Sequence, residues 1–84
     1  MLDLLYFAWV RERMGKPAES LPIPPGVGTI GALAIWLHDR DSNGRNAFAN
    51  STHIRAAVNQ HFATPETPIA DGDEIAFFPP VTGG

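Results

Sequence analysis

The chain has 84 residues, of which 44% are hydrophobic and 18% are charged, and its net charge is −3. This length and composition predict one small globular domain rather than a disordered chain. With only six lysines and arginines in total, the charge argues against binding to nucleic acid or to anionic membranes.

The chain contains no cysteine. Disulfides, thiolate nucleophiles and sulfur-based metal sites are therefore excluded, and we expect a cytoplasmic location. No apolar run approaches the roughly 20 residues that span a bilayer. The first residues include an acidic side chain and no basic leader segment, so we expect mature structure from the start rather than a signal peptide.

The first elements are short. Residues 2–9 (LDLLYFAW) are aliphatic and aromatic, which predicts a central strand with both faces buried. Residues 10–16 predict a short charged helical turn that Gly15 can end. A brief second strand is expected at 19–23, where the prolines are compatible only with an edge of the sheet or with the last residues of the strand.

The main helix is expected within residues 27–41, with Thr29 as its N-cap. Four apolar residues recur at the spacing of one helical face: Ile30, Leu33, Ala34 and Leu37. Residues 41–53 are rich in asparagine, serine and glycine, which predicts a long surface connection that Phe48 can pin down.

The second half of the chain predicts two more strands. Residues 54–60 alternate in the manner of a strand, with the apolar residues on one side. Asp71 and Gly72 form a tight-turn pair, and residues 74–80 (EIAFFPP) predict the last strand. A hairpin, one helix packed across the sheet and further strands together describe an α+β roll.

The last strand separates its two phenylalanines. Strand geometry turns Ile75 and Phe77 one way and Ala76 and Phe78 the other. If the helix covers one face, one phenylalanine lies in the core and the other on the surface. An exposed phenylalanine forgoes about 1.5–3 kcal/mol of burial, which a partner surface would recover. The alternative is that both are buried, the second under the long connection.

The tail beyond this strand is slender. Pro79 and Pro80 lack the N–H groups that a sheet needs, and they favour an extended chain. Six residues from Pro79 can reach about 20 Å from the body. Gly83 and Gly84 have no Cβ, which suits a narrow channel. A frayed end is the alternative, but the apolar strand that runs directly into the tail favours insertion into a partner.

Three segments together resemble a known family. They are LYFAWVRERMG near the start, AVNQ at 57–60 and DGDEIAFFPPVTGG at 71–84. The chain resembles the ubiquitin-like β-grasp proteins and, more closely, the small sulfur-carrying subunits of molybdopterin synthases. The resemblance is most specific in the end motif and holds only in outline from about residue 24 to 53. It implies a β-grasp roll over residues 1–78, with a mixed sheet of four to five strands and one main helix, and an extended tail over 79–84.

The resemblance also implies a role for the tail. An ATP-using, ubiquitin-activating-like enzyme would adenylate the carboxylate of Gly84, and a sulfur donor would displace AMP to leave a thiocarboxylate. Gly83 would be the slender residue behind it, and neither a metal nor a permanently bound cofactor is expected. The large subunit of a heterotetrameric synthase would then present cyclic pyranopterin monophosphate to the sulfur. The strip that docks on the large subunit would be Phe78, Pro79, Pro80, Val81 and Thr82.

Two other functions remain open for a chain with this ending. One is sulfur delivery for thiamine thiazole synthesis, although those carriers tend to be shorter and lack the FFPPV strip. The other is a ubiquitin-like modifier whose Gly84 is joined to lysines of target proteins. A pure binding module would leave the bare glycine end unexplained.

The remaining polar residues predict no catalytic site. His38, His53 and His61 lack the spacing of metal ligands, and we expect them to be solvated or half-buried. Arg11 and Arg13 are expected on a solvated face, with contact to the large subunit as the alternative. No pair of carboxylates is positioned for acid–base work. The hydrolytic and transfer chemistry is therefore expected from partner enzymes.

Overall fold

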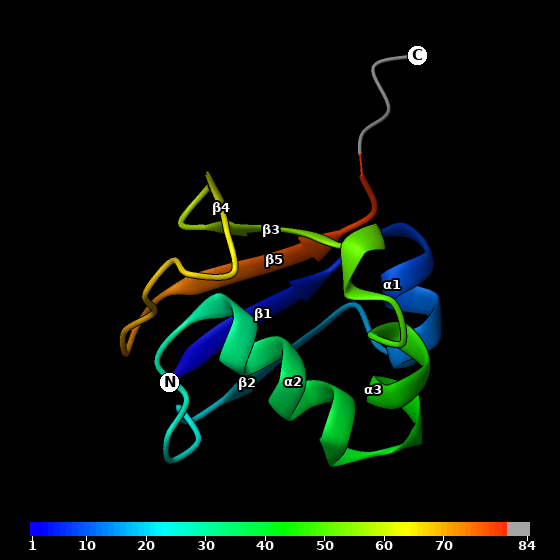
Figure 1. The fold of residues 1–84 in the computed structure, drawn as a ribbon, viewed down its shortest axis with the longest axis horizontal. Coiled ribbons are helices and arrows are strands. Elements are labelled where there is room, and N and C mark those ends of the chain that lie inside the picture. Colours follow the sequence, from blue (N-terminus) through cyan, green and yellow to red (C-terminus); the bar gives the residue numbers. More distant parts are fainter. Residues whose placement is uncertain (81–84) are drawn as a thin grey trace.

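The computed structural model describes residues 1–80, and its framework is a five-stranded mixed sheet (Figure 1). The strands are β1 (Leu2–Tyr6), β2 (Ala18–Leu21), β3 (Arg55–Val58), β4 (His61–Ala63) and β5 (Glu74–Phe78). Their order across the sheet is β2-β1-β5-β3-β4. β1 and β5 run parallel, and the other neighbours are antiparallel. The last strand of the chain is thus the central strand of the sheet.

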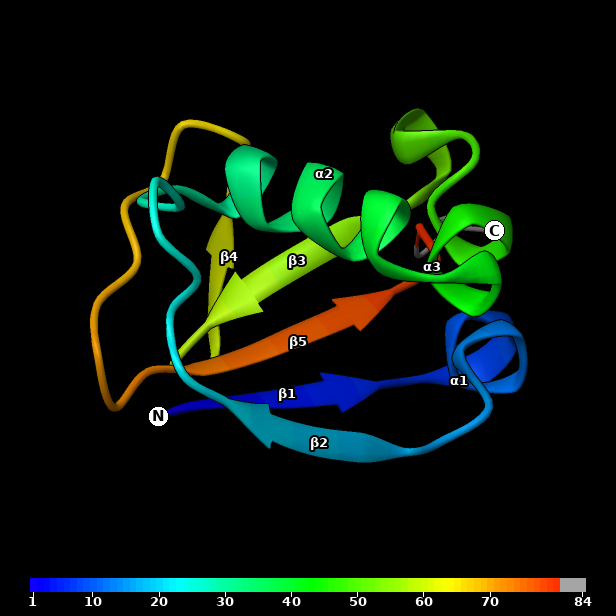
Figure 2. The same cartoon turned by 90° about the horizontal axis from the view of Figure 1, so that it is seen from below.

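Three helices and one short turn complete the fold. They are α1 (Ala8–Met14), α2 (Ile30–Arg40), α3 (Ser42–Ala47) and the 3-10 turn η1 (Ser51–His53). Figure 2 shows α2 lying across one face of the sheet, with α1 and α3 gathered at one end. Within residues 1–80, the opposite face of the sheet carries no helix. This arrangement confirms the expected α+β roll of the β-grasp type.

The core lies between α2 and the covered face of the sheet. Leu4, Ile75 and Phe77 from β1 and β5 form one buried cluster with Leu33 and Leu37 of α2. Each such side chain contributes about 1.5–3 kcal/mol when it leaves water. In a domain this small, that cluster holds the central strand in place.

The start of α2 is as the sequence predicts. The backbone N–H of Ala32 donates to Oγ1 of Thr29 at 3.2 Å, so Thr29 is the N-cap. The first two N–H groups of α2, those of Ile30 and Gly31, donate to the carbonyls of Thr67 and Pro65 at 3.0 and 2.9 Å. These bonds attach the start of α2 to the loop between β4 and β5. No helix within residues 1–80 has the length and hydropathy that crossing a membrane requires.

The expectation of a first strand with two buried faces is wrong. β1 ends at Tyr6 rather than at residue 9, and the chain continues as α1. Asp3 is exposed and Leu5 is only half-buried, because no helix of residues 1–80 covers the open side of the sheet. Gly15 ends α1 in the left-handed conformation (φ 78°), as predicted.

Two elements were not predicted. The polar stretch expected as a loop contains α3, whose first turn is capped by Asp41: its Oδ1 accepts the N–H of Gly44 at 2.8 Å. The strand β4 follows β3 through a two-residue hairpin turn, in which Asn59 and Gln60 both have positive φ (51° and 71°). Such primed turns usually contain glycine at the second position, and Gln60 in its place conceals the hairpin from sequence analysis.

Candidate functional site

The end of β5 is held more firmly than an ordinary chain end. The strand pairs with β1 on one side and β3 on the other, up to the pair Arg55–Phe78. The carbonyl of Phe77 also accepts the N–H of Phe7 at 3.1 Å. Pro79 then ends the ladder because it has no N–H to donate. Figure 1 shows the chain leaving the sheet at this point.

The two phenylalanines lie on opposite faces, as predicted. Phe77 is 1% exposed, stacks on Tyr6 with ring centroids 6.3 Å apart, and meets Phe48 edge-on at 5.1 Å. Phe78 is half-buried on the open face, where its ring lies 6.1 Å from that of Phe62. The alternative in which the long connection buries Phe78 is therefore wrong, since Phe48 from that connection packs on Phe77.

Phe78 belongs to an apolar surface on the open face of the sheet, which we name the open-face patch. The strand registers align Leu5, Ala76, Ala57 and Phe62 in one row across β1, β5, β3 and β4. Phe62 is 86% exposed and Phe7, which follows β1, is 47% exposed. The patch consists of Leu5, Phe7, Ala57, Phe62, Ala76 and Phe78.

The opposite end of this face is polar. Ser20 donates to Oδ1 of Asp3 at 2.7 Å, and Asn59 donates to Oδ1 of Asp73 at 2.9 Å. The apolar half of the open face therefore lies at the end from which Pro79 and Pro80 depart. Of the residues expected to dock, Phe78, Pro79 and Pro80 are half-buried. Val81, Thr82, Gly83 and Gly84 lie outside the described residues.

The sequence missed the contributions of Phe7 and Phe62 to this surface. The predicted first strand includes Phe7, and no strand is predicted around Phe62. Only the hairpin that creates β4 brings Phe62 opposite Ala57 and beside Phe78. A signal was present, since a large apolar residue in a polar stretch favours a sheet edge or an interface.

The displaced pKa values within residues 1–80 occur in one structural network. The guanidinium of Arg40 donates from two nitrogens to the two carboxylate oxygens of Glu19, each at 2.9 Å, and the Tyr6 hydroxyl donates to the same carboxylate at 2.7 Å. Burial opposes the ionisation of Glu19, but these bonds and the nearby positive charges outweigh it and lower the Glu19 pKa to about 2. Burial and the Glu19 carboxylate raise the pKa of Tyr6.

This network is a clamp rather than a catalytic site. Its hydrogen bonds also raise the pKa of Arg40, so both charges are fixed at neutral pH. A general acid or base needs a pKa near the working pH. Among residues 1–80, no group of three or more histidine, cysteine, aspartate or glutamate side chains is arranged to hold a metal ion.

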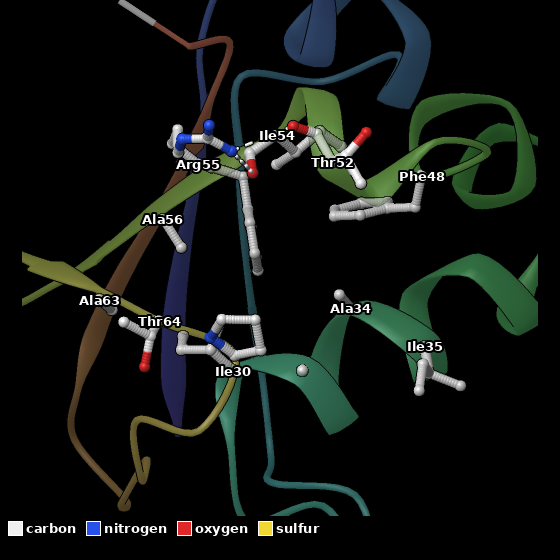
Figure 3. A pocket seen from close by; sticks show the side chains of 13 residues that line it. Ile30, Ala34, Ile35, Phe48, Thr52, Ile54, Arg55, Ala56, Ala63 and Thr64 are labelled. Carbon is white, nitrogen blue, oxygen red and sulfur yellow. Dashed lines mark hydrogen bonds between the residues drawn. The ribbon is translucent and has the colours of Figure 1, made fainter.

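A groove of about 500 Å³ lies on the covered side of the sheet, between α2 and the strands β3 and β4 (Figure 3). Small residues create it, including Gly31, Ala34, Ala56 and Ala63. Arg55 is the one ionisable residue among those that line it, and its guanidinium donates to the Thr52 carbonyl at 3.0 Å. The groove offers no acid–base pair.

A second pocket, of about 400 Å³, lies at the root of the tail. We name it the tail-root pocket. Its lining consists of Trp9, Arg13, Ala47, Ala49, Asn50, His53, Pro79 and Pro80. It shares Pro79 and Pro80 with the expected docking strip, which also includes Phe78 of the open-face patch.

Comparisons with known proteins agree with this geometry. The sequence matches the ThiS family over residues 4–84. It is 41% identical to the molybdopterin synthase sulfur carrier subunit of Escherichia coli, over the whole of both chains.

Two solved structures have similar folds. SAMP1 from Haloferax volcanii superposes with a TM-score of 0.72 at 26% identity, covering 99% of this chain and 98% of that one. A chain from the complex of subunits 1 and 2 of molybdopterin-converting factor from Helicobacter pylori gives a TM-score of 0.64 at 20% identity, covering 99% and 97%. With a β-grasp body, a central last strand and a family match that extends to residue 84, the chain belongs to the ThiS family and is a homologue of molybdopterin synthase sulfur carrier subunits.

Proposed function

We propose that this chain is the sulfur carrier of a molybdopterin synthase and that it works through the carboxylate of Gly84. The observation that carries the proposal is the full-length match to a sulfur carrier subunit. The fold supports it: the strand that leads to the tail is the central one, paired on both sides. A carrier needs a rigid body to aim its reacting group, since positioning lowers the barrier of a transfer step.

The proposed chemistry begins with activation. A carboxylate is a poor electrophile, so an adenylating enzyme joins the Gly84 carboxylate to the α-phosphorus of ATP and releases pyrophosphate. A sulfur donor then attacks the acyl carbon, the bond to AMP breaks, and a thiocarboxylate remains. No electrons are gained or lost when the donor delivers sulfide. The product is anionic and a soft nucleophile, comparable to an activated cysteine.

Transfer follows inside the large subunit. The thiocarboxylate sulfur forms a bond to a side-chain carbon of cyclic pyranopterin monophosphate as a carbon–oxygen bond at that carbon breaks. Water then cleaves the acyl–sulfur bond, which restores the Gly84 carboxylate for another cycle and leaves the sulfur on the pterin. Two deliveries build the dithiolene. ATP is a substrate of the adenylating enzyme and is not held by the carrier. The slender Gly83 and Gly84 suit this role because no Cβ obstructs a narrow channel.

We propose that the open-face patch and the strip beginning with Phe78, Pro79 and Pro80 dock on the large subunit. Phe62 and Phe7 are exposed at the side from which the tail departs. Burying each of these side chains against a partner would stabilise the complex by about 1.5–3 kcal/mol. The similar Helicobacter pylori chain is taken from a complex of two subunits, which supports a large-subunit partner for this chain as well.

A reconstituted synthase tests the proposal. The chain is combined with the large subunit, the adenylating enzyme, ATP, a sulfide source and cyclic pyranopterin monophosphate, and molybdopterin is measured. Deleting Gly84, or adding one glycine after it, should abolish product formation and leave the circular dichroism spectrum unchanged. Full activity of the extended chain would show that the reacting atom is not at this position.

A ubiquitin-like protein modifier remains the second candidate function. It is favoured by the 26% identity to SAMP1, whose full name is small archaeal modifier protein 1. In that case the adenylated Gly84 would be attacked by a lysine amine instead of by sulfur. The product would be an isopeptide-linked species of higher mass, which the same reaction mixture would reveal on a denaturing gel.

A further inference from the structure

The tail-root pocket has the chemistry of an anion site. Among residues 1–80, its lining contains Arg13, His53 and Asn50 but no aspartate or glutamate. That composition is unusual in a chain whose net charge is −3. Because no carboxylate in this lining neutralises the guanidinium of Arg13, an anionic ligand can do so.

The guanidinium of Arg13 is positioned to bind an anion. It lies 4.4 Å from the centroid of the Trp9 ring, which supports its plane. Two other basic side chains, Lys16 and Arg40, pair with Glu19 instead. Within residues 1–80, no acidic side chain forms a salt bridge with Arg13. A planar guanidinium in this state can receive a carboxylate through two parallel hydrogen bonds.

Asn50 presents a donor to the same space. Its Oδ1 accepts hydrogen bonds from the N–H and the hydroxyl of Thr52, the latter at 2.6 Å. The amide NH₂ of Asn50 is therefore the group that remains for a ligand. His53 adds a ring nitrogen that can donate. The pocket thus favours an acceptor over a donor.

The walls of the pocket are apolar. They are supplied by Trp9, Ala47, Ala49, Pro79 and Pro80. These surfaces suit the methylene stem of a side chain whose charged end reaches Arg13. Any protein that accepts residues beyond Pro80 must also approach this pocket, because the two prolines line it.

We propose that the tail-root pocket receives an acidic side chain, glutamate or aspartate, of the large synthase subunit. The inference rests on the proposed function and adds a polar anchor to the apolar docking surface. The open-face patch contacts the large subunit on one side of the tail, and the Arg13–carboxylate pair fixes it on the other. Paired contacts on both sides define the direction in which the tail enters its channel.

Calorimetric titration of the purified chain into the large subunit tests this. Arg13→Gln should weaken binding about tenfold or more, and Arg13→Glu further, since a desolvated carboxylate loses its partner or meets a like charge. Arg13→Lys should lie in between because it keeps the charge without the planar fork. The control is Arg45→Glu, an exposed position on α3 outside the pocket with the same charge change.

Salt provides an independent readout. Raising the sodium chloride concentration should weaken wild-type binding more steeply than binding of the Arg13→Gln variant. Equal affinities for Arg13→Glu and Arg45→Glu would overturn the inference while leaving the proposed function intact. A wild-type chain that does not bind the large subunit at all would overturn both. Unchanged thermal unfolding of Arg13→Gln shows that the loss arises at the interface.

Discussion

Arg40 and Glu19 are 21 positions apart, yet their side chains form a two-pronged salt bridge with both N–O distances at 2.9 Å. Arg40 ends α2 and Glu19 lies in the edge strand β2. With the Tyr6 hydroxyl on the same carboxylate, the pair joins the main helix to the first hairpin. The edge strand β2 is thereby attached to α2.

The clamp predicts a specific acid sensitivity. The Glu19 pKa is about 2 in the folded chain against an ordinary 4.5. Because ionised Glu19 is favoured in the folded chain, it adds to the free energy of unfolding. This contribution is fully present above about pH 4.5 and is lost as the pH falls toward 2. Urea unfolding should show that Glu19→Gln lowers the free energy of unfolding by roughly 2–3 kcal/mol at pH 7 and by less near pH 3. The exposed Glu66→Gln is the control; a loss for Glu19→Gln that stays constant with pH would contradict the assignment.

The absence of a side chain at Gly44 allows α2 and α3 to approach each other closely. A Cβ at this position would lie 1.8 Å from the carbonyl oxygen of Leu37, which is backbone and cannot move aside. Gly44→Ala should therefore cost at least about 3 kcal/mol, or prevent folding. Gly28→Ala is the matched control, because a Cβ there meets nothing within 4 Å. Similar thermal midpoints for the two variants would show that the helices can separate without loss.

Substitutions of the two phenylalanines of β5 should affect different properties, stability for Phe77 and binding for Phe78. Phe77→Ala empties the core between Tyr6 and Phe48 and should cost about 3–5 kcal/mol in urea unfolding. Phe78→Glu should leave the free energy of unfolding within about 1 kcal/mol and weaken binding to the large subunit about tenfold or more. Titration calorimetry measures the second effect. A large stability loss with unchanged binding would place Phe78 in the core instead.

Local signals predicted part of this fold well. The cap at Thr29, the left-handed Gly15 and the alternation of β5 each depend on neighbours in sequence, and all three are confirmed. The same alternation separated Phe77 from Phe78. The end motif indicated the family without any three-dimensional information.

The missed features depend on contacts between distant segments. α3 forms because Asp41 caps a polar stretch and Gly44 fits against α2, neither of which gives a periodic pattern. The edge strand β4 is only three residues long. The tail-root pocket joins α1 to the segment after α3 and to the prolines. Sequence periodicity describes single elements, so it could not have placed Arg13 beside this end of the chain.

If Gly84 carries the sulfur, intact-mass spectrometry should detect the sulfur on the chain. The chain is incubated with ATP, the adenylating enzyme and sulfide, with a variant lacking Gly84 treated in parallel. We expect the wild-type mass to rise by the replacement of one oxygen by one sulfur, and the mass of the shortened variant to stay unchanged. An unchanged wild-type mass under conditions that load an authentic carrier, or sulfur found on both chains, would contradict it.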